Sequence, residues 1–330
     1  MRSDAASAAL LRVLRLSRGR MGVTLVYHRV AERAGDRRTE LVPAIAARDF
    51  ARHLTLVAAH FQAVRASELP AAVARRRRGG RIPVAVTFDD DISEHRSIVA
   101  PLLRAYGVPA TFFLTGAFLE KMASFWWDDL QRAIDARAVN ADDLRPLDPA
   151  TVVAALDRHP YAIHRLASEI EQMQPPERRR IGEFLSERVA QKALGAEALT
   201  ACDVAALSVD FEIAFHTRRH DVLPALEDVE LRLAFSEGRS EIEALVGHPL
   251  TAIAYPHGKA DSRVAAAARA EGFACGYTGR QAIFRVGEDP MLIGRLEPRP
   301  GSSPMQFAWS LVKPLVSASR AGNNPPAIGR

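Results

Sequence analysis

The fold of this 330-residue chain is decided by the stretch Ile82-Pro83-Val84-Ala85-Val86-Thr87-Phe88, which runs directly into Asp89-Asp90-Asp91. A continuous apolar run of this length predicts a strand that is covered on both faces. We expect a helix from Ser93 to Tyr106, stopped by Gly107, and then a second strand at 109–114. A strand, a helix and a strand in this order predict a parallel βαβ unit and therefore an α/β fold.

The same alternation continues on both sides of this unit. Toward the N-terminus, a β-branched run at 22–28 predicts a strand whose end presents Tyr27 and His28. The other expected strands are 61–64, 211–215, 250–255, about 274–277 and about 291–296, and the other expected helices are 47–59, 67–75, 227–245 and 262–270. We therefore expect one α/β domain over residues 22–300.

One internal stretch and the two ends of the chain do not follow this alternation. Residues from Phe125 to about Ala206 have helical spacing with few β-branched runs, which predicts a helical insertion. Residues 1–21 interleave apolar residues with arginines, as in a basic leader helix that lies on a membrane surface or docks on the domain. Residues 301–330 form a C-terminal segment, whose Gly-, Asn- and Pro-containing tail is expected to be disordered.

Composition narrows the function classes. Lys and Arg number 44 against 39 Asp and Glu, and this net charge of +5, without aromatics interleaved among the basic residues, argues against nucleic-acid binding. The only two cysteines, Cys202 and Cys275, exclude a disulfide framework and a cysteine zinc site. No apolar stretch is long enough to span a membrane, and arginines break the leader, so we expect neither a transmembrane helix nor a signal peptide. A cytoplasmic protein, with peripheral membrane contact through residues 1–20 as an option, fits this composition.

Polar clusters follow three of the expected strands. These clusters are Asp89 to Asp91, His216 to His220, and Pro256-His257-Gly258. Because parallel strands end at one edge of a sheet, the clusters should converge. His216 and His220 would share one face of a helical turn, and Asp90 would complete a three-ligand metal site. Taken singly, each cluster is also consistent with a helix cap, a surface histidine pair or a turn.

These clusters also carry a family resemblance. Residues Thr87 to Asp90, Phe215 to His220 and Ala254 to Gly258 resemble the first three motifs of the polysaccharide deacetylases, the NodB-homology carbohydrate esterases of family four. Further similarity to the exopolysaccharide-biosynthesis branch lies at 25–30, 107–113, 126–128 and 294–296. The resemblance implies an irregular (β/α)7-type barrel, which agrees with the element order above.

The resemblance also implies roles for individual residues. Asp90, His216 and His220 would bind a divalent metal, usually zinc in this family, and Asp89 would be the general base. Backbone N–H groups of the motif loop around Tyr255 and Pro256 would stabilise the oxyanion. An amide is a poor electrophile, so this chemistry needs both a polarising cation and a proton acceptor.

The sequence departs from the family pattern at two places. No histidine follows His257, so the late histidine that protonates the leaving amine is absent, and His28 or His257 becomes the candidate general acid. His28 is equally consistent with a structural residue at the barrel mouth. The usual glycine after the paired aspartates is Asp91, which either points outward as a cap or alters metal affinity. We expect His95, about a turn into the next helix, at the surface.

The sequence therefore predicts a metal-dependent hydrolase that removes an N-acetyl group from an amino sugar. The expected substrate is a glycan or a lipid-linked sugar precursor. Two alternatives remain: a deformylase or amidase with the same metal site, and a glycan-binding homologue that has lost catalysis. The oligomeric state is not encoded in any pattern that we can identify.

Overall fold

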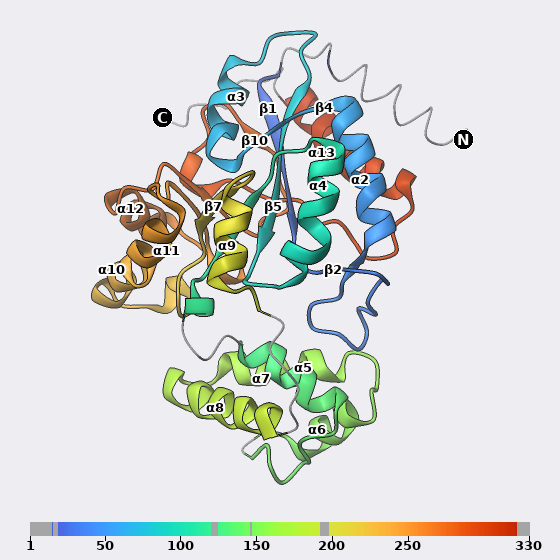
Figure 1. Cartoon of the computed structure of the whole chain (residues 1–330), viewed down its shortest axis with the longest axis vertical. Helices are drawn as coiled ribbons and strands as arrows, with labels where there is room; N and C mark the ends of the chain where they lie inside the picture. The colour runs from blue at the N-terminus through green and yellow to red at the C-terminus, as the bar shows by residue number, and fades with distance from the viewer. Residues whose placement is uncertain (1–14, 16–18, 120–124, 146, 192–197, 322–330) are drawn as a thin grey trace.

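The computed structural model describes residues 15, 19–119, 125–145, 147–191 and 198–321, and its centre is one curled, mainly parallel sheet (Figure 1). The strand order is β10-β1-β5-β6-β7-β8-β9, with β10 antiparallel to β1 and β4 paired with the first half of β5. The strands are β1 (Met21–Tyr27), β4 (Phe61–Val64), β5 (Ile82–Asp89), β6 (Thr111–Leu114), β7 (Glu212–Phe215), β8 (Ala252–Ala254), β9 (Cys275–Tyr277) and β10 (Phe284–Arg285); β2 (Val30–Ala31) and β3 (Ile45–Ala46) form a separate pair.

The curled sheet is closed by an extended segment instead of a regular strand. Ile293 forms a parallel bridge with Tyr277 of β9, and Leu296 forms one with Leu25 of β1. The backbone hydrogen bonds from Leu296 N–H to Thr24 C=O (2.8 Å) and from Val26 N–H to Leu296 C=O (3.1 Å) complete the link. The architecture is therefore an irregular α/β barrel, and the expected fold class is confirmed.

Helices cover the outside of this sheet, as parallel pairing requires (Figure 1). They are α2 (Ala47–His60), α3 (Leu69–Arg75), α4 (Ala100–Tyr106), α9 (Ala201–Ser208), α10 (Asp228–Ser236), α11 (Arg239–Val246), α12 (Ser262–Ala270) and α13 (Pro304–Ala321). Short 3-10 turns lie at Ala66–Glu68, Ala117–Leu119, Leu223–Ala225, Pro256–Gly258 and Pro290–Leu292. The main apolar cluster joins buried residues of the strands to those of the outer helices, including Phe112 and Phe307.

Two expected helices have a different form in the structure. The helix expected from Ser93 begins with a π-helical turn over His95–Val99 and continues as α4. The helix expected over 227–245 is divided into α10 and α11 at Gly238, whose φ is 76°. A Cβ atom at Gly238 would lie 2.2 Å from Arg218 Nε, so the helix breaks at a position that only glycine can occupy without displacing that side chain.

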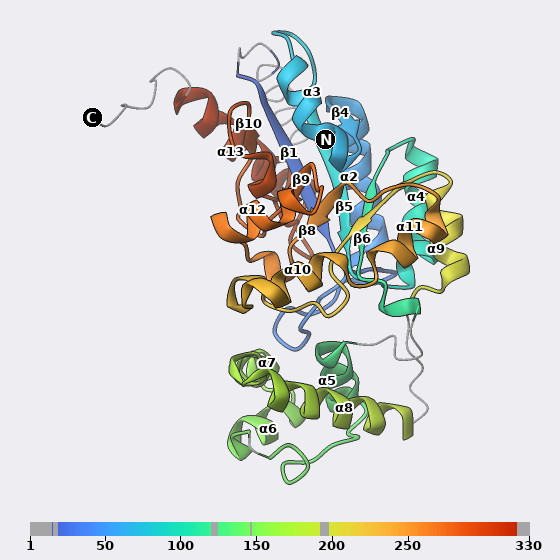
Figure 2. The same ribbon diagram turned by 90° about the vertical axis from the view of Figure 1, so that its left-hand side faces the viewer.

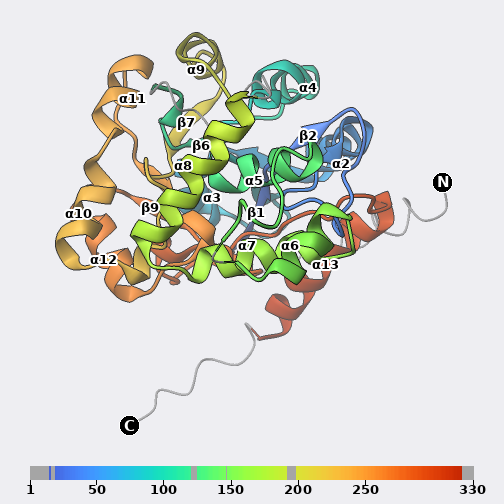
Figure 3. The same ribbon diagram turned by 90° about the horizontal axis from the view of Figure 1, so that it is seen from below.

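Four helices form a separate layer below the barrel. They are α5 (Trp126–Asp135), α6 (Pro149–Leu156), α7 (Ala162–Gln172) and α8 (Pro175–Gln191), and they pack around their own apolar cluster, which includes Leu130, Leu166 and Leu185. Figure 2 shows this layer from the side, and Figure 3 shows it lying across the end of the barrel. Helix α9 also falls within the expected insertion, but its Val204 and Leu207 belong to the barrel core.

Several of the predictions made from the sequence concern the two ends of the chain. The leader helix and its membrane contact lie almost entirely outside the described residues, as does the tail beyond Ala321. The segment 304–321, for which the sequence analysis assigned no element, is the helix α13, and its Phe307 ring stacks on His53 of α2. Among the described residues, no helix combines the length and apolar character needed to cross a bilayer.

Candidate active site

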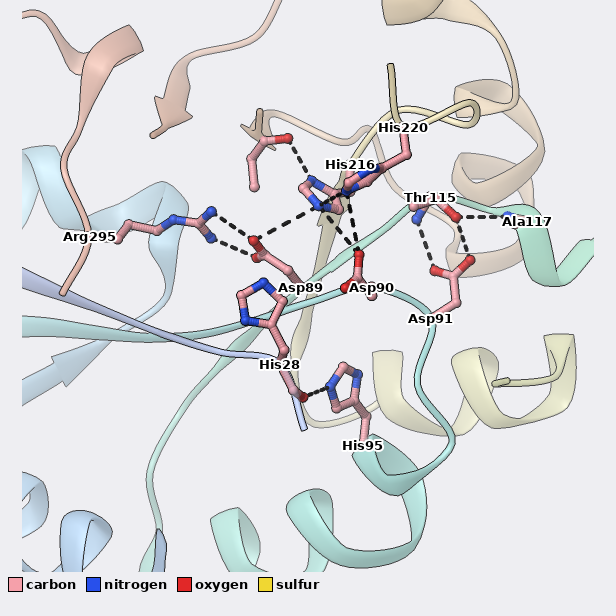
Figure 4. A network of polar contacts seen from close by, with 11 residues as sticks. His28, Asp89, Asp90, Asp91, His95, Thr115, Ala117, His216, His220 and Arg295 are labelled. Carbon is pink, nitrogen blue, oxygen red and sulfur yellow. Dashed lines mark hydrogen bonds and ion pairs between the residues drawn. The ribbon is translucent and has the colours of Figure 1, made fainter. Parts of the chain in front are cut away.

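The polar groups expected at the strand ends do converge (Figure 4), in a cleft that residues of α5 and α7 also line. Asp89 ends β5 and Asp90 follows it, while His216 follows β7. His216 Nε2 lies 3.6 Å from Asp90 Oδ1 and 3.2 Å from His220 Nε2, and His220 Nε2 lies 3.7 Å from the same Asp90 oxygen. Three potential ligand atoms therefore face one point.

This cluster fits a divalent metal ion. Asp90, His216 and His220 each offer one ligand atom, and Asp90 Oδ1 is buried without a hydrogen-bond partner among the described residues. Burial and the neighbouring Asp89 raise the pKa of Asp90 well above its usual value, a cost that a bound cation would relieve. Three ligands of a tetrahedral zinc ion lie about 3.3–3.6 Å apart, close to the separations observed here.

Both histidines are held in the neutral form that a metal ligand requires. Burial lowers the pKa of His216 to about 4, and burial together with His216 lowers the pKa of His220 well below its usual value. His216 Nδ1 lies 2.8 Å from the carbonyl oxygen of Ala254 and donates to it, so Nε2 keeps its lone pair for the cluster. The Trp127 and His257 rings flank His220, each with its centroid 4.6 Å away.

The two histidines do not share the face of a helical turn, and that expectation was wrong. Residues 216–220 form an irregular turn in which Thr217 has φ 55° and His220 has φ 50°. These left-handed conformations are uncommon for residues with a side chain. The turn bends the chain back so that His220 meets His216, and the four-residue spacing alone does not reveal this path.

Asp89 is held by a residue from the far end of the chain. Arg295 Nη1 and Nη2 donate to its two carboxylate oxygens at 2.6 and 2.7 Å, and both residues are about 2% exposed. Burial opposes the charge on Asp89, but Arg295, with a smaller effect of His216, outweighs it and lowers the pKa of Asp89 to about 2. In the sequence, Arg295 belongs only to the similarity at 294–296, and no motif assigned it a role.

Asp91 neither caps a helix at the surface nor joins the metal cluster. It is 4% exposed, and it accepts hydrogen bonds from the Thr115 backbone N–H at 2.9 Å and from the Thr115 hydroxyl at 2.5 Å. Asp91 therefore ties the end of β5 to the end of β6. Its charge still contributes to the raised pKa of Asp90, behind burial and the larger effect of Asp89.

The two candidate general acids both line the cleft that contains the cluster, and they have different partners. The His28 ring points toward Asp89 in Figure 4, and the His28 carbonyl accepts a hydrogen bond from His95 Nε2 at 2.8 Å. His257 Nδ1 lies 3.5 Å from Glu171 Oε1 of α7. The surface position expected for His95 was wrong: its ring packs against Phe88 and Phe112 and is fully buried.

Most backbone N–H groups of the motif loop are already engaged. Tyr255 N–H donates to Tyr277 C=O at 2.9 Å, Gly258 N–H donates to Tyr255 C=O at 2.9 Å, and Pro256 has no N–H. The Tyr255 side chain is buried, and its hydroxyl donates to Met291 C=O. The expected group of oxyanion donors is therefore reduced to the N–H of His257.

A cleft of about 490 Å³ contains the cluster and the groups around it. The barrel supplies its floor, and the helices α5 and α7 supply Trp126, Trp127, Ser168 and Glu171. A cleft of this size is typical of a small-molecule or glycan site. The helical layer therefore forms one wall of the cavity that contains the potential metal ligands.

An α/β barrel with two histidines and a carboxylate gathered at its strand ends could hold a metal ion there. The family model for polysaccharide deacetylases matches residues 76–171 and 204–276, just over half of the chain. The chain belongs to the polysaccharide deacetylase family. The matched ranges include Asp89, Asp90, His216 and His220, whereas Arg295 and His28 lie outside them. A search of the curated proteins gave no match.

Solved structures share the fold at low sequence identity. The deacetylase PplD of Streptococcus pyogenes, solved with acetate, is 14% identical with a TM-score of 0.59, covering 88% of this chain and 97% of that one. IcaB from Ammonifex degensii is 19% identical with a TM-score of 0.54, covering 89% and 98%. A de-N-acetylase from Aggregatibacter actinomycetemcomitans is 16% identical with a TM-score of 0.52, covering 87% and 99%.

Proposed function

We propose that this protein hydrolyses the N-acetyl group of an amino sugar, within a glycan or a lipid-linked precursor, and releases acetate. The observation that carries the proposal is the meeting of Asp90, His216 and His220 in one cleft with Asp89, which Arg295 holds. A set of metal ligands beside a buried carboxylate is the arrangement that metal-assisted amide hydrolysis requires.

Asp90, His216 and His220 would hold the cation, and two nitrogen ligands with one oxygen ligand favour zinc. When bound, a zinc ion supplies Lewis acidity, which polarises an acyl carbonyl and makes water a better nucleophile at neutral pH. The Ala254 carbonyl fixes the tautomer of His216 for this purpose.

We assign Asp89 as the proton acceptor for the attacking water. Its pKa of about 2 keeps it ionised at neutral pH, and the two hydrogen bonds from Arg295 fix the direction of its carboxylate. Asp89 Oδ2 lies 3.9 Å from His216 Nε2, so the acceptor and the metal ligands share one small volume. This closeness supports the transfer of a proton from a water held between them.

We assign His28 as the proton donor to the leaving amine and the His257 N–H as the oxyanion donor. The His28 ring faces Asp89 across the cleft, and its backbone is fixed by His95, whereas the His257 ring is engaged with Glu171. His257 N–H belongs to the motif loop that borders the metal ligands. A sugar amide bound between the two residues would have a proton donor on one side and a hydrogen-bond donor on the other.

The test is acetate release from N-acetylated amino sugars by zinc-loaded protein, with and without chelator. We expect Asp90→Asn and His216→Ala to abolish activity and stoichiometric zinc binding, and His248→Ala, at an exposed histidine away from the cleft, to change neither. Activity that survives both chelator and these substitutions would overturn the proposal. Release of formate alone would indicate a deformylase, and zinc binding without turnover of any acetyl surrogate would indicate a binding protein.

A further inference from the structure

The cleft at the metal cluster does not end at the catalytic groups. A second cavity of about 690 Å³, which we call the outer hollow, adjoins it. Leu41, His164, Gln281 and Glu297 line both cavities. The other residues that line the outer hollow are Arg37, Pro43, Tyr161, Pro298, Arg299 and Pro300. The two cavities together therefore offer more volume than one acetylated sugar ring needs.

The outer hollow is built from three parts of the chain that hold one another in place. Tyr161 N–H donates to Arg38 C=O at 2.6 Å, and His164 Nε2 donates to Arg37 C=O at 3.0 Å, so α7 and its start fix the loop before β3. Gln281 Oε1 accepts from Glu297 N–H at 3.2 Å. These links hold the 37–38 loop on α7 and the segment at Glu297 on Gln281 without a bound molecule.

Two arginines are among the residues that line this cavity. Arg37 comes from the loop before β3, and Arg299 comes from the segment after the barrel closes. Within the described part of the chain neither lies in an ion pair, whereas Arg295 in the adjoining cleft is bound to Asp89. Arg299 lies between two prolines, which restrict its backbone.

The charges are separated along the cavity. Glu297, the one carboxylate among the described residues that line the outer hollow, also borders the metal cleft. It therefore lies on the side of the outer hollow that is nearer to the metal ligands, and it repels an anion from the junction. The exposed Tyr161 ring adds a flat apolar surface of the kind on which sugar rings stack. This order of charges favours a substrate whose neutral sugar lies near Glu297, where the two cavities meet, and whose anionic group lies farther into the outer hollow.

We propose that the outer hollow is a subsite for a phosphate or diphosphate group carried by the substrate, bound by Arg37 and Arg299. This inference rests on the proposed deacetylase function and names its substrate class: an N-acetylated amino sugar linked to phosphate. Two guanidinium forks can together pair four acceptor oxygens, which matches the several oxygens of a phosphate or diphosphate better than a single sugar carboxylate.

The first test measures binding without catalysis. Pyrophosphate is titrated calorimetrically into the full-length protein after removal of metal, so that the anion has no metal to bind. We expect Arg37→Ala and Arg299→Ala each to weaken binding about tenfold, with weaker binding at higher salt. The matched control is Arg38→Ala, because this exposed side chain lies in the same loop but does not line the cavity. No pyrophosphate binding, or equal loss in Arg38→Ala, would overturn the subsite.

The second test uses the zinc-loaded enzyme on matched substrates. We expect KM for N-acetylglucosamine 1-phosphate to rise about tenfold in Arg37→Ala and Arg299→Ala, and KM for a neutral N-acetylated oligosaccharide to stay unchanged. Equal effects on both substrates would refute the inference and leave the deacetylase function standing. Pyrophosphate binding that depends on both arginines, without turnover of any substrate, would refute the function and leave the subsite standing.

Two further substrates distinguish a lipid-linked sugar from a nucleotide sugar as the molecule that carries the phosphate. UDP-N-acetylglucosamine and a short-chain polyprenyl diphosphate N-acetylglucosamine both present a diphosphate next to the sugar. Faster turnover of the polyprenyl substrate would assign the subsite to lipid-linked sugars, and faster turnover of the nucleotide sugar would assign it to nucleotide sugars. Turnover of neutral oligosaccharides above both would reject a phosphorylated substrate.

Discussion

Replacing Arg295 with methionine should destabilise the metal-free protein by about 3–5 kcal/mol, because it leaves the Asp89 carboxylate buried without its partner. Arg295 donates to both Asp89 oxygens at 2.6 and 2.7 Å, and the two side chains are about 3% exposed. Methionine retains much of the length and apolar stem of arginine, so the loss of charge and hydrogen bonds dominates over a change in packing.

The magnitude follows from the attraction between the two charges and from its effect on the pKa of Asp89. Opposite charges about 4 Å apart attract by about 4 kcal/mol at the effective dielectric constant of a protein site. The pKa of Asp89 falls from 3.8 to about 2 even though burial acts in the opposite direction. At 1.36 kcal/mol per pKa unit this net change corresponds to about 2 kcal/mol, and Arg295 is first among the groups that lower the pKa.

The assay is urea denaturation at pH 7 in the presence of a chelator, with unfolding monitored by circular dichroism. Asp89→Asn combined with Arg295→Met should recover part of the loss, because no unpaired charge remains. The control is Arg145→Met, which breaks the Arg145–Asp142 pair, whose side chains are 76% and 84% exposed, and it should cost less than about 1 kcal/mol. A loss below about 1 kcal/mol in Arg295→Met, or no recovery in the double variant, would refute the reasoning.

Three other outcomes are expected. Zinc at about a thousand times its Kd should stabilise the wild type by about 4 kcal/mol and raise its Tm. The Tm of His216→Ala should not change on addition of zinc. An equal rise in Tm in both proteins would place the metal elsewhere. Burial lowers the pKa of His53, stacked on Phe307, to about 4, so only the unfolded state binds its proton between pH 6.5 and 4. Stability should therefore fall by about 3 kcal/mol as the pH drops through this window, and urea midpoints of His53→Asn should show a shallower fall than wild type. Asp91→Gly should lower the free energy of unfolding, measured in urea, by about 1–3 kcal/mol, because the Thr115 N–H loses its acceptor. Zinc stoichiometry should stay unchanged. Loss of zinc would instead link Asp91 to the metal cluster.

The parts of the fold predicted from the sequence are those that short-range patterns encode. The apolar run of β5 and the β-branched run of β1 gave strands close to their observed bounds, and the alternation of strands and helices gave the α/β class. The convergence of Asp90 with His216 and His220 was also expected, because parallel strands end at a common edge. These inferences need only periodicity and topology.

Other features depend on contacts between distant residues. His95 lies in a polar-looking segment, yet it is buried because its ring packs on Phe88 and Phe112 and its Nε2 bonds to the His28 carbonyl. The path of 216–220 depends on left-handed residues that no local preference of threonine or histidine predicts. The close approach of the Arg218 side chain to Gly238, at the break between α10 and α11, is likewise a contact between distant residues.

The sequence by itself determined the α/β class and the residues that could hold a metal, because hydrophobic periodicity and strand order act locally and do not require coordinates, and the family resemblance implied the barrel. Only the tertiary structure decided that Arg295 holds Asp89 across 206 positions of the chain, that Asp91 bonds to Thr115, and that Arg37 and Arg299 face one hollow. Closure of the curled sheet places the segment around Leu296 beside β1. Charged residues that are far apart in the sequence, such as Asp89 and Arg295, can pair only once this closure has brought them together.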